Sequence, residues 1–173
     1  IYTDYTLFTS HKGILTEVEK VFDFLTTTYR VRKYKHLIVS PHYTESTFTR
    51  LIQQEILNAK AGKPASIRIK MNSFTSYKMI DRLYQASQAG VKIKMVIRGI
   101  NCLVPGVKGQ SENIEAISVV DKFLEHPRVF IFENGGDSKV YISSADWMTR
   151  NIENRVEVGV PIYQEDLKQE VID

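Results

Sequence analysis

Hydrophobic residues recur along the chain with two different periods. Spacing of about 3.6 residues predicts amphipathic helices, and such segments are residues 14–25, 44–61 and 77–89. Short apolar runs and alternation of apolar with polar residues predict strands, here residues 36–40, 65–72, 91–98 and 155–161. Residues 113–125 are predicted to be helical at least in part, and residues 164–173 to begin a last helix. Strands that alternate with helices indicate an α/β layered domain with a partly parallel sheet.

The segment from His126 to Arg150 predicts a β-hairpin. Val129 and Ile131 share one face of its first strand, and Phe130 and Phe132 share the other. Asn134-Gly-Gly-Asp137 is a turn sequence, and a second extended run covers residues 139–143. The hairpin makes the sheet mixed. If the two strands end on the same side, it brings His126 close to the polar segment from Ser144 to Asp146.

Length and composition are those of a globular protein. The chain has 173 residues, of which 43% are hydrophobic and 25% charged, enough for one domain with a core and a piece of a second. One cysteine excludes an internal disulfide and favours a reducing compartment. No apolar run approaches the roughly 20 residues that cross a bilayer, and no signal peptide is visible. The chain begins without methionine inside ordered-looking sequence, so we expect a fragment.

Charge is distributed unevenly. The formal net charge is +3, but residues 60–98 hold nine Lys and Arg against one acid, whereas residues 112–173 hold six against thirteen. This asymmetry indicates either a surface that meets an anion or a set of solvated helix and strand faces. Lys92 and Lys94 likewise either begin a basic wall or protect a strand from edge pairing.

Several kinds of site are excluded by their missing motifs. The sequence has no Walker loop, dinucleotide fingerprint or serine hydrolase elbow. Its four histidines and one cysteine lack zinc-ligand spacing. One constellation remains, His126-x-Arg128-x4-Glu133 followed by Ser144-x-Asp146. It is a looser form of the H-x-K-x4-D and G-S-x-N elements of the phospholipase D superfamily. A histidine ionises near neutral pH and suits phosphoryl chemistry, although a histidine at a strand start is often structural.

Longer stretches resemble the C-terminal region of bacterial polyphosphate kinases of the large, phospholipase-D-like type. They are Ile1-Tyr-Thr-Asp4, Val96-Ile-Arg-Gly99, Leu124 to Asp137 and Val140 to Asn151. The resemblance implies two phospholipase-D-like domains that face each other across a tunnel. It implies reversible transfer of the terminal phosphate of ATP to inorganic polyphosphate, with magnesium. Residues 1–35 would end the first of these domains and connect it to the second, residues 36–173.

The resemblance also implies roles for particular residues. Tyr2 matches a tyrosine that contacts the nucleotide, Arg98 a phosphate-binding arginine, and His126 the second active-site histidine. The phosphorylated histidine of the family and its magnesium-associated arginines would lie upstream of Ile1, and no metal ligand is expected in this chain. Arg128, Lys139 and Asp146 are further candidates for phosphate contact; Arg128 and Lys139 are otherwise exposed hairpin charges. Asp146 has two more roles open to it, orienting His126 or capping the turn before Trp147.

These expectations define a function and two alternatives. We expect an enzyme with ATP or ADP and polyphosphate as partners, no nucleic acid, and a homo-oligomer at full length. We expect it in the cytoplasm, free or associated with a membrane, and we expect the fragment alone to be inactive. The first alternative is half of a phospholipase-D-like phosphodiesterase or nuclease. The second is a non-catalytic polyanion-binding module.

Overall fold

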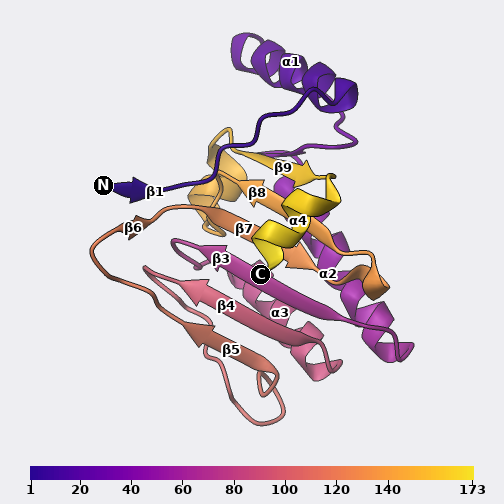
Figure 1. The fold of residues 1–173 in the computed structure, drawn as a ribbon, viewed down its shortest axis with the longest axis vertical. Helices are drawn as coiled ribbons and strands as arrows, with labels where there is room; N and C mark the ends of the chain where they lie inside the picture. The colour runs from indigo at the N-terminus through magenta and orange to yellow at the C-terminus, as the bar shows by residue number, and fades with distance from the viewer.

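A computed structural model describes residues 1–173 and is built on a seven-stranded mixed sheet (Figure 1). The strands of this sheet are β2 (Ile38–Val39), β3 (Ser66–Met71), β4 (Lys92–Ile97), β5 (Ile114–Ile117), β7 (Arg128–Phe132), β8 (Lys139–Ser143) and β9 (Val158–Ile162). Their spatial order is β2-β9-β8-β7-β3-β4-β5. The β3–β4 and β4–β5 pairs are parallel, and the other four pairs are antiparallel. The predicted mixed, partly parallel α/β sheet is therefore confirmed.

Four helices pack around this sheet. They are α1 (Lys12–Thr26), α2 (Thr44–Lys60), α3 (Tyr77–Gln88) and α4 (Glu165–Ile172). In Figure 1, α2 and α3 lie behind the sheet and α4 lies in front of it. The apolar residues of α4 pack on Val129, Ile131, Val140 and Ile162 of the front face. The α1 helix stands beyond the β2 end of the sheet, so α2 and α3 cover one face and α4 alone covers the other.

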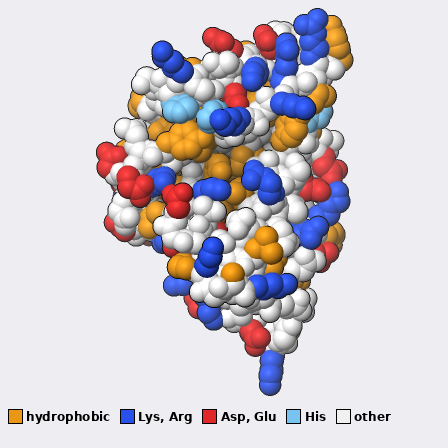
Figure 2. Space-filling view, turned by 90° about the vertical axis from the view of Figure 1, so that its right-hand side faces the viewer, with side chains coloured by type: hydrophobic (Ala, Val, Ile, Leu, Met, Phe, Trp, Pro, Cys, Tyr) orange, Lys and Arg blue, Asp and Glu red, His pale blue; other side chains and the backbone are white.

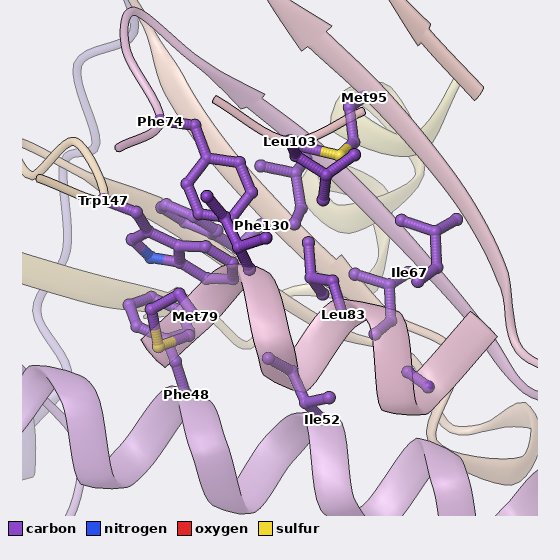
Figure 3. Packing of buried hydrophobic residues seen from close by; sticks show 14 of the residues in the cluster. Phe48, Ile52, Ile67, Phe74, Met79, Leu83, Met95, Leu103, Phe130 and Trp147 are labelled. Carbon is purple, nitrogen blue, oxygen red and sulfur yellow. The ribbon is translucent and has the colours of Figure 1, made fainter. Parts of the chain in front are cut away.

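Aromatic side chains form the centre of the core between the sheet and α2 (Figure 3). Trp147 is fully buried and stacks on Phe130, with ring centroids 5.2 Å apart and planes 19° apart. Phe48 of α2 lies 5.2 Å from the Trp147 ring, and Phe74 lies 5.4 Å from it. The backbone N–H groups of Thr75 and Ser76 also donate to the Trp147 carbonyl. These contacts hold the residues just before Trp147 against the end of β3.

The β7–β8 hairpin forms as predicted. Arg128 pairs with Ser143 at its open end, and Phe132 pairs with Lys139 beside the turn. The turn is a short 3-10 segment at Asn134–Gly136. All three of its residues have positive φ, which glycine adopts without strain and asparagine tolerates better than most residues. This conformation explains the Asn-Gly-Gly sequence.

The helix predicted within residues 113–125 is wrong. Residues 114–117 form β5, which pairs with β4, and residues 124–125 form β6 (Leu124–Glu125). Ile117 and Val120 have helical spacing, but they are 61% and 79% exposed and form no buried stripe. Pairing with the N–H and C=O groups of β4 decides the structure instead. Because β4 is therefore an inner strand, edge protection does not explain Lys92 and Lys94.

The first residues of the chain are held in place by pairing with β6. Strand β1 (Tyr2–Thr3) runs parallel to β6, with Tyr2 opposite Leu124. Further along, Ile14 and Val21 of α1 pack on Leu37 and Val39. Residues 1–35 thus contact residues 36–173 in two places. None of the helices has the length and apolar character needed to cross a bilayer.

Candidate functional site

Four strand ends meet at one edge of the sheet. Because β3 and β4 are parallel and β7 is antiparallel to β3, the carboxyl ends of β3 and β4 lie beside the start of β7 and the end of β8. Asn72 directly follows β3, Arg98 directly follows β4, His126 precedes β7 by two residues, and Asp146 follows β8 by three. This edge lies on the left in Figure 1, beside β1 and β6. Ligands of α/β sheets commonly bind at such an edge.

His126 lies at the centre of this edge. Its Nδ1 is 2.7 Å from Oδ2 of Asp4, and its Nε2 is 3.0 Å from Nη1 of Arg128. The Tyr2 ring approaches the imidazole edge to face, with centroids 5.4 Å apart. Burial alone would raise the pKa of Asp4, but hydrogen bonds from His126 and from the Tyr5 N–H outweigh burial and lower that pKa. Asp4 is therefore an anion beside His126 at neutral pH.

Arg128 is held from behind by Asp146. Its Nε and Nη2 donate to Oδ1 and Oδ2 of Asp146 over 3.2 and 3.3 Å, a forked ion pair. The Arg128 side chain is 11% exposed and that of Asp146 only 4%. Asp146 also accepts from the backbone N–H of Asn72 at 2.8 Å and from Asn72 Nδ2 at 3.3 Å. Asn72, at the end of β3, thus fixes the Asp146 carboxylate, and this carboxylate in turn fixes the Arg128 guanidinium.

A depression of about 620 Å³ opens in front of these groups. Polar and charged side chains line most of it, and Arg150 and Arg155 add exposed cations. Glu157 lies in the same depression, where its carboxylate accepts from Ser144 Oγ and Asn151 Nδ2. Arg155 Nη1 is 4.0 Å from Glu157, which is too far for a strong pair. The cationic side chains at this opening suit an anionic ligand.

Arg98 lies at the same edge but lines a second depression. That depression measures about 300 Å³ and is lined by residues 119–125 together with Arg98 and Ile1. The Arg98 Nε is buried and has no hydrogen-bond partner. Arg98 is connected to His126 indirectly, through its neighbour Gly99. The Gly99 N–H donates to the Asn72 carbonyl over 2.8 Å, and Asn72 donates to Asp146, which holds Arg128 beside His126. A Cβ on Gly99 would lie 2.9 Å from that carbonyl oxygen, so only glycine permits this approach.

The structure brings four of the predicted site residues together, and it leaves out Arg98, which lines the second depression, and Lys139. Tyr2, His126, Arg128 and Asp146 are connected by direct contacts, and Asp146 reaches His126 only through Arg128. Lys139 lies at the turn end of β8, about 13 Å along the strand from Ser143. It is not part of this group. Lys and Arg also spread over the face in Figure 2, which is the side away from β1 and β6, so charge alone does not locate the site.

The sequence did not single out Asn72, Arg150, Arg155 or Glu157, although these residues also line the depression beside His126. Asn72 could have been found, because it ends the predicted strand 65–72 and polar residues at the carboxyl ends of parallel strands often bind ligands. Arg150 and Arg155 border a π-helical segment, Arg150–Asn154, that has no clear sequence signal.

The side chains at this edge do not by themselves form a metal site. No group of three or more His, Cys, Asp or Glu side chains is placed to bind an ion. Asp4 is engaged by His126, and Asp146 by Arg128 and Asn72. A magnesium ion brought with a phosphate ligand would therefore depend on ligands beyond these residues.

Comparisons with known proteins identify the family. The family model for polyphosphate kinase C-terminal domain 2 matches residues 37–173. The polyphosphate kinases of Vibrio parahaemolyticus and Escherichia coli K12 are 54% and 47% identical over all 173 residues. The chain spans about a quarter of the length of these relatives, since the match covers 25% of each.

Solved structures agree with this assignment. The crystal structure of polyphosphate kinase from Porphyromonas gingivalis matches 95% of this chain and 25% of that one, with a TM-score of 0.91 and 41% identity. The phospholipase D family member Nuc from Salmonella typhimurium has a TM-score of 0.54 and 19% identity, and covers 79% of this chain and 87% of that one. The second match concerns the fold alone, which is phospholipase-D-like. The chain belongs to the polyphosphate kinase family, and residues 37–173 correspond to its C-terminal domain 2.

Proposed function

We propose that this chain forms part of an enzyme that reversibly transfers the terminal phosphate of ATP to inorganic polyphosphate. His126, Arg98 and Tyr2 are the nucleotide and phosphate contacts of its share of the active site. The observation that carries this proposal is the group of Asp4, His126 and Arg128 at the opening of a cation-rimmed depression. It occurs in a chain of the polyphosphate kinase family.

Transfer would take place in two steps. A histidine nitrogen upstream of Ile1 attacks the terminal phosphorus of ATP, and the bond from that phosphorus to the bridging oxygen of ADP breaks. The terminal oxygen of a polyphosphate chain then attacks the phosphohistidine and frees the upstream histidine. His126 and the arginines would offset the negative charge on the transferring group and on the ADP leaving group, which is the main demand of phosphoryl transfer.

Magnesium would supply further neutralisation of the β- and γ-phosphates when it is bound with ATP. Its ligands would be the phosphates and residues upstream of this chain, since Asp4 and Asp146 are already engaged. Polyphosphate carries about one negative charge per phosphate, so we expect binding that weakens with added salt, as for nucleic-acid backbones.

A chimera tests this proposal. The quarter of the Vibrio parahaemolyticus polyphosphate kinase that matches this chain at 54% identity is replaced by residues 1–173. ATP-dependent polyphosphate synthesis is then measured. We expect the chimera to be active and the His126→Ala and Arg98→Ala variants to lose about 100-fold or more, as for removal of a group that stabilises developing charge.

Matched controls keep the test specific. His42→Ala changes an exposed histidine and Arg82→Ala a half-buried arginine; neither residue lines the depression beside His126, so both variants should keep full activity. Full activity in both His126→Ala and Arg98→Ala would refute the site assignment. A folded chimera that cleaves phosphodiesters without ATP, and makes no polyphosphate, would instead support the phosphodiesterase alternative.

A further inference from the structure

The two nitrogens of His126 face partners of opposite character. A carboxylate can only accept a hydrogen bond and a guanidinium can only donate one. Nδ1 lies 2.7 Å from the Asp4 carboxylate, so it must carry a proton. Nε2 lies 3.0 Å from Nη1 of Arg128, so in this arrangement it must present its lone pair. The two contacts together select one neutral tautomer, with the proton on Nδ1.

The position of Arg128 does not depend on His126 alone. Asp146 accepts from Nε and Nη2, which turns the remaining nitrogen, Nη1, toward both Nε2 and the carbonyl oxygen of His126. Asp146 is 3% exposed, and its oxygens accept from both nitrogens of Asn72. The forked geometry leaves the guanidinium little freedom, because planar guanidinium and carboxylate groups match in one plane.

We propose that Asp146 is a positioning residue that acts on His126 through Arg128. It holds the imidazole as the Nδ1–H tautomer and keeps the Nε2 lone pair at the opening of the depression. The proposal rests on the proposed function for its catalytic meaning, whereas the tautomer itself is a property of this chain.

The arrangement has a consequence for anion binding. A proton on Nε2 would face the N–H of Arg128, so two donors would oppose each other at 3.0 Å. A phosphate oxygen between the two groups could accept from both of them. Anion binding and protonation of Nε2 therefore favour each other. The other charged groups on this depression are Asp4 behind the ring, and Arg150, Arg155 and Glu157 along its rim.

Histidine nitrogen resonances test the proposal directly on the 173-residue chain. Two-bond nitrogen–proton correlation spectra of ¹⁵N-histidine-labelled protein at pH 8 distinguish protonated from unprotonated ring nitrogens. A His126→Gln sample identifies the His126 signals among those of four histidines. We expect a protonated Nδ1 and an unprotonated Nε2. A protonated Nε2 with an unprotonated Nδ1 would overturn the proposal.

Two variants separate positioning from a merely structural role. Asp146→Asn and Arg128→Lys should each lower the ratio of the Nδ1–H to the Nε2–H tautomer by about tenfold, as expected for loss of one hydrogen bond to a charged group. An unchanged ratio in a folded variant, judged by circular dichroism, would refute the role of Asp146. If one variant does not fold, the other gives the same test.

Tripolyphosphate is the probe for the coupling. Added to the wild-type chain at pH 8, it should protonate Nε2 while Nδ1 keeps its proton, and it should do so less in Arg128→Lys. Binding without any change at Nε2 would refute the coupling. A chimera inactive in polyphosphate synthesis would count against the proposed function but not against the tautomer, so the two failures are distinguishable.

Discussion

The carboxylate of Asp4 lies 2.7 Å from Nδ1 of His126, although 122 residues separate them in the chain. The contact exists because β1 pairs with β6, whose last residue, Glu125, directly precedes His126. The orientation of the candidate active-site histidine therefore depends on a residue outside the part of the chain that the C-terminal domain 2 model matches.

Replacing Asp4 by asparagine should impair activity much more than stability. In the chimera, Asp4→Asn should lower polyphosphate synthesis about tenfold or more through loss of the hydrogen bond from His126 to a charged carboxylate. Stability in urea should change by less than about 1 kcal/mol because both side chains are more than a third exposed. Equal activity of variant and parent would show that the pair does not orient His126.

The pH behaviour of this pair follows from the lowered pKa of Asp4. A carboxyl whose pKa is lower in the folded state stabilises the fold above its unfolded value, and this contribution is lost as the pH falls through the lowered pKa. The Asp4–His126 contact should therefore survive at neutral pH. The contact should be lost only at acidic pH, when Asp4 is protonated. NMR should detect this protonation as a change in the chemical shift of the Asp4 carboxyl carbon.

Glu17 joins α1 to the strand that follows it, and its removal should destabilise the chain. Its carboxylate accepts from the backbone N–H groups of Lys35, His36 and Leu37 over 2.5, 2.9 and 2.8 Å. Glu17→Ala leaves these donors without a partner and should cost roughly 2–4 kcal/mol in urea unfolding. Glu19→Ala, an exposed neighbour on the same helix, should cost less than about 0.5 kcal/mol.

Glu17 should also make the stability of the chain depend on pH. Burial would raise the pKa of Glu17, but the N–H groups of Leu37, Lys35 and His36 outweigh burial and lower it. Its stabilisation should be fully present above the unfolded glutamate value of about 4.3 and lost as the pH falls through the lowered pKa. Glu17→Ala should therefore lose less stability than the wild type on acidification. An identical acid dependence would contradict this account.

Glu55 should have the opposite pH dependence. It is fully buried on α2, where one carboxylate oxygen accepts from the Asn134 N–H over 2.6 Å and the other has no partner. Burial raises its pKa to about 6, in spite of the N–H groups that hydrogen-bond to it. The folded state then binds a proton more tightly than the unfolded state, where glutamate titrates at about 4.3. Stability should fall as the pH rises from about 4.3 to about 6.

Replacing Glu55 by glutamine isolates this effect. The Glu55 contribution corresponds to roughly 1–3 kcal/mol between these pH values, and Glu55→Gln should remove that slope from the urea unfolding free energy. Glu112→Gln, at an exposed position, should leave the slope as it is. A slope that persists in Glu55→Gln would assign it to another group.

Gly99 should be intolerant of even a methyl group. A Cβ there would lie 2.8 Å from Ser73 Oγ and 2.9 Å from the Asn72 backbone oxygen. Relief of this clash must move the end of β3, where Asn72 holds Asp146. Gly99→Ala should cost about 1–3 kcal/mol of stability, as overpacking does, and should lower the Nδ1–H tautomer of His126 as Asp146→Asn does.

A second glycine provides the control. A Cβ on Gly13 would meet only ring atoms of His36 and His11, which belong to side chains and not to the backbone. Alanine also favours helix more than glycine does, so Gly13→Ala should cost less than Gly99→Ala in the same urea assay. The reverse order would show that the close approach of β3 and β4 is not what requires glycine.

The sequence by itself determined those features that depend on residues close together in the chain. The β7–β8 hairpin follows from alternation around Asn134-Gly-Gly, and it carries Arg128 and Asp146 to one end of the sheet. The motif Val96-Ile-Arg-Gly99 and the residues from His126 onward indicated the family. Local periodicity failed at residues 114–117, because those residues pair with β4 and no neighbouring residue reveals a hydrogen-bond partner in another strand.

Only the tertiary structure decided which side chains meet at the edge. Asp4, Asn72 and Asp146 are far apart in sequence, and strand order and register bring them to His126 and Arg128. Register also placed Lys139 at the opposite end of the hairpin from Ser143, and so outside the site. The physical reason is that hydrogen bonds tolerate errors of only a few tenths of an ångström. Such positions are set by packing across the whole sheet and not by any one segment.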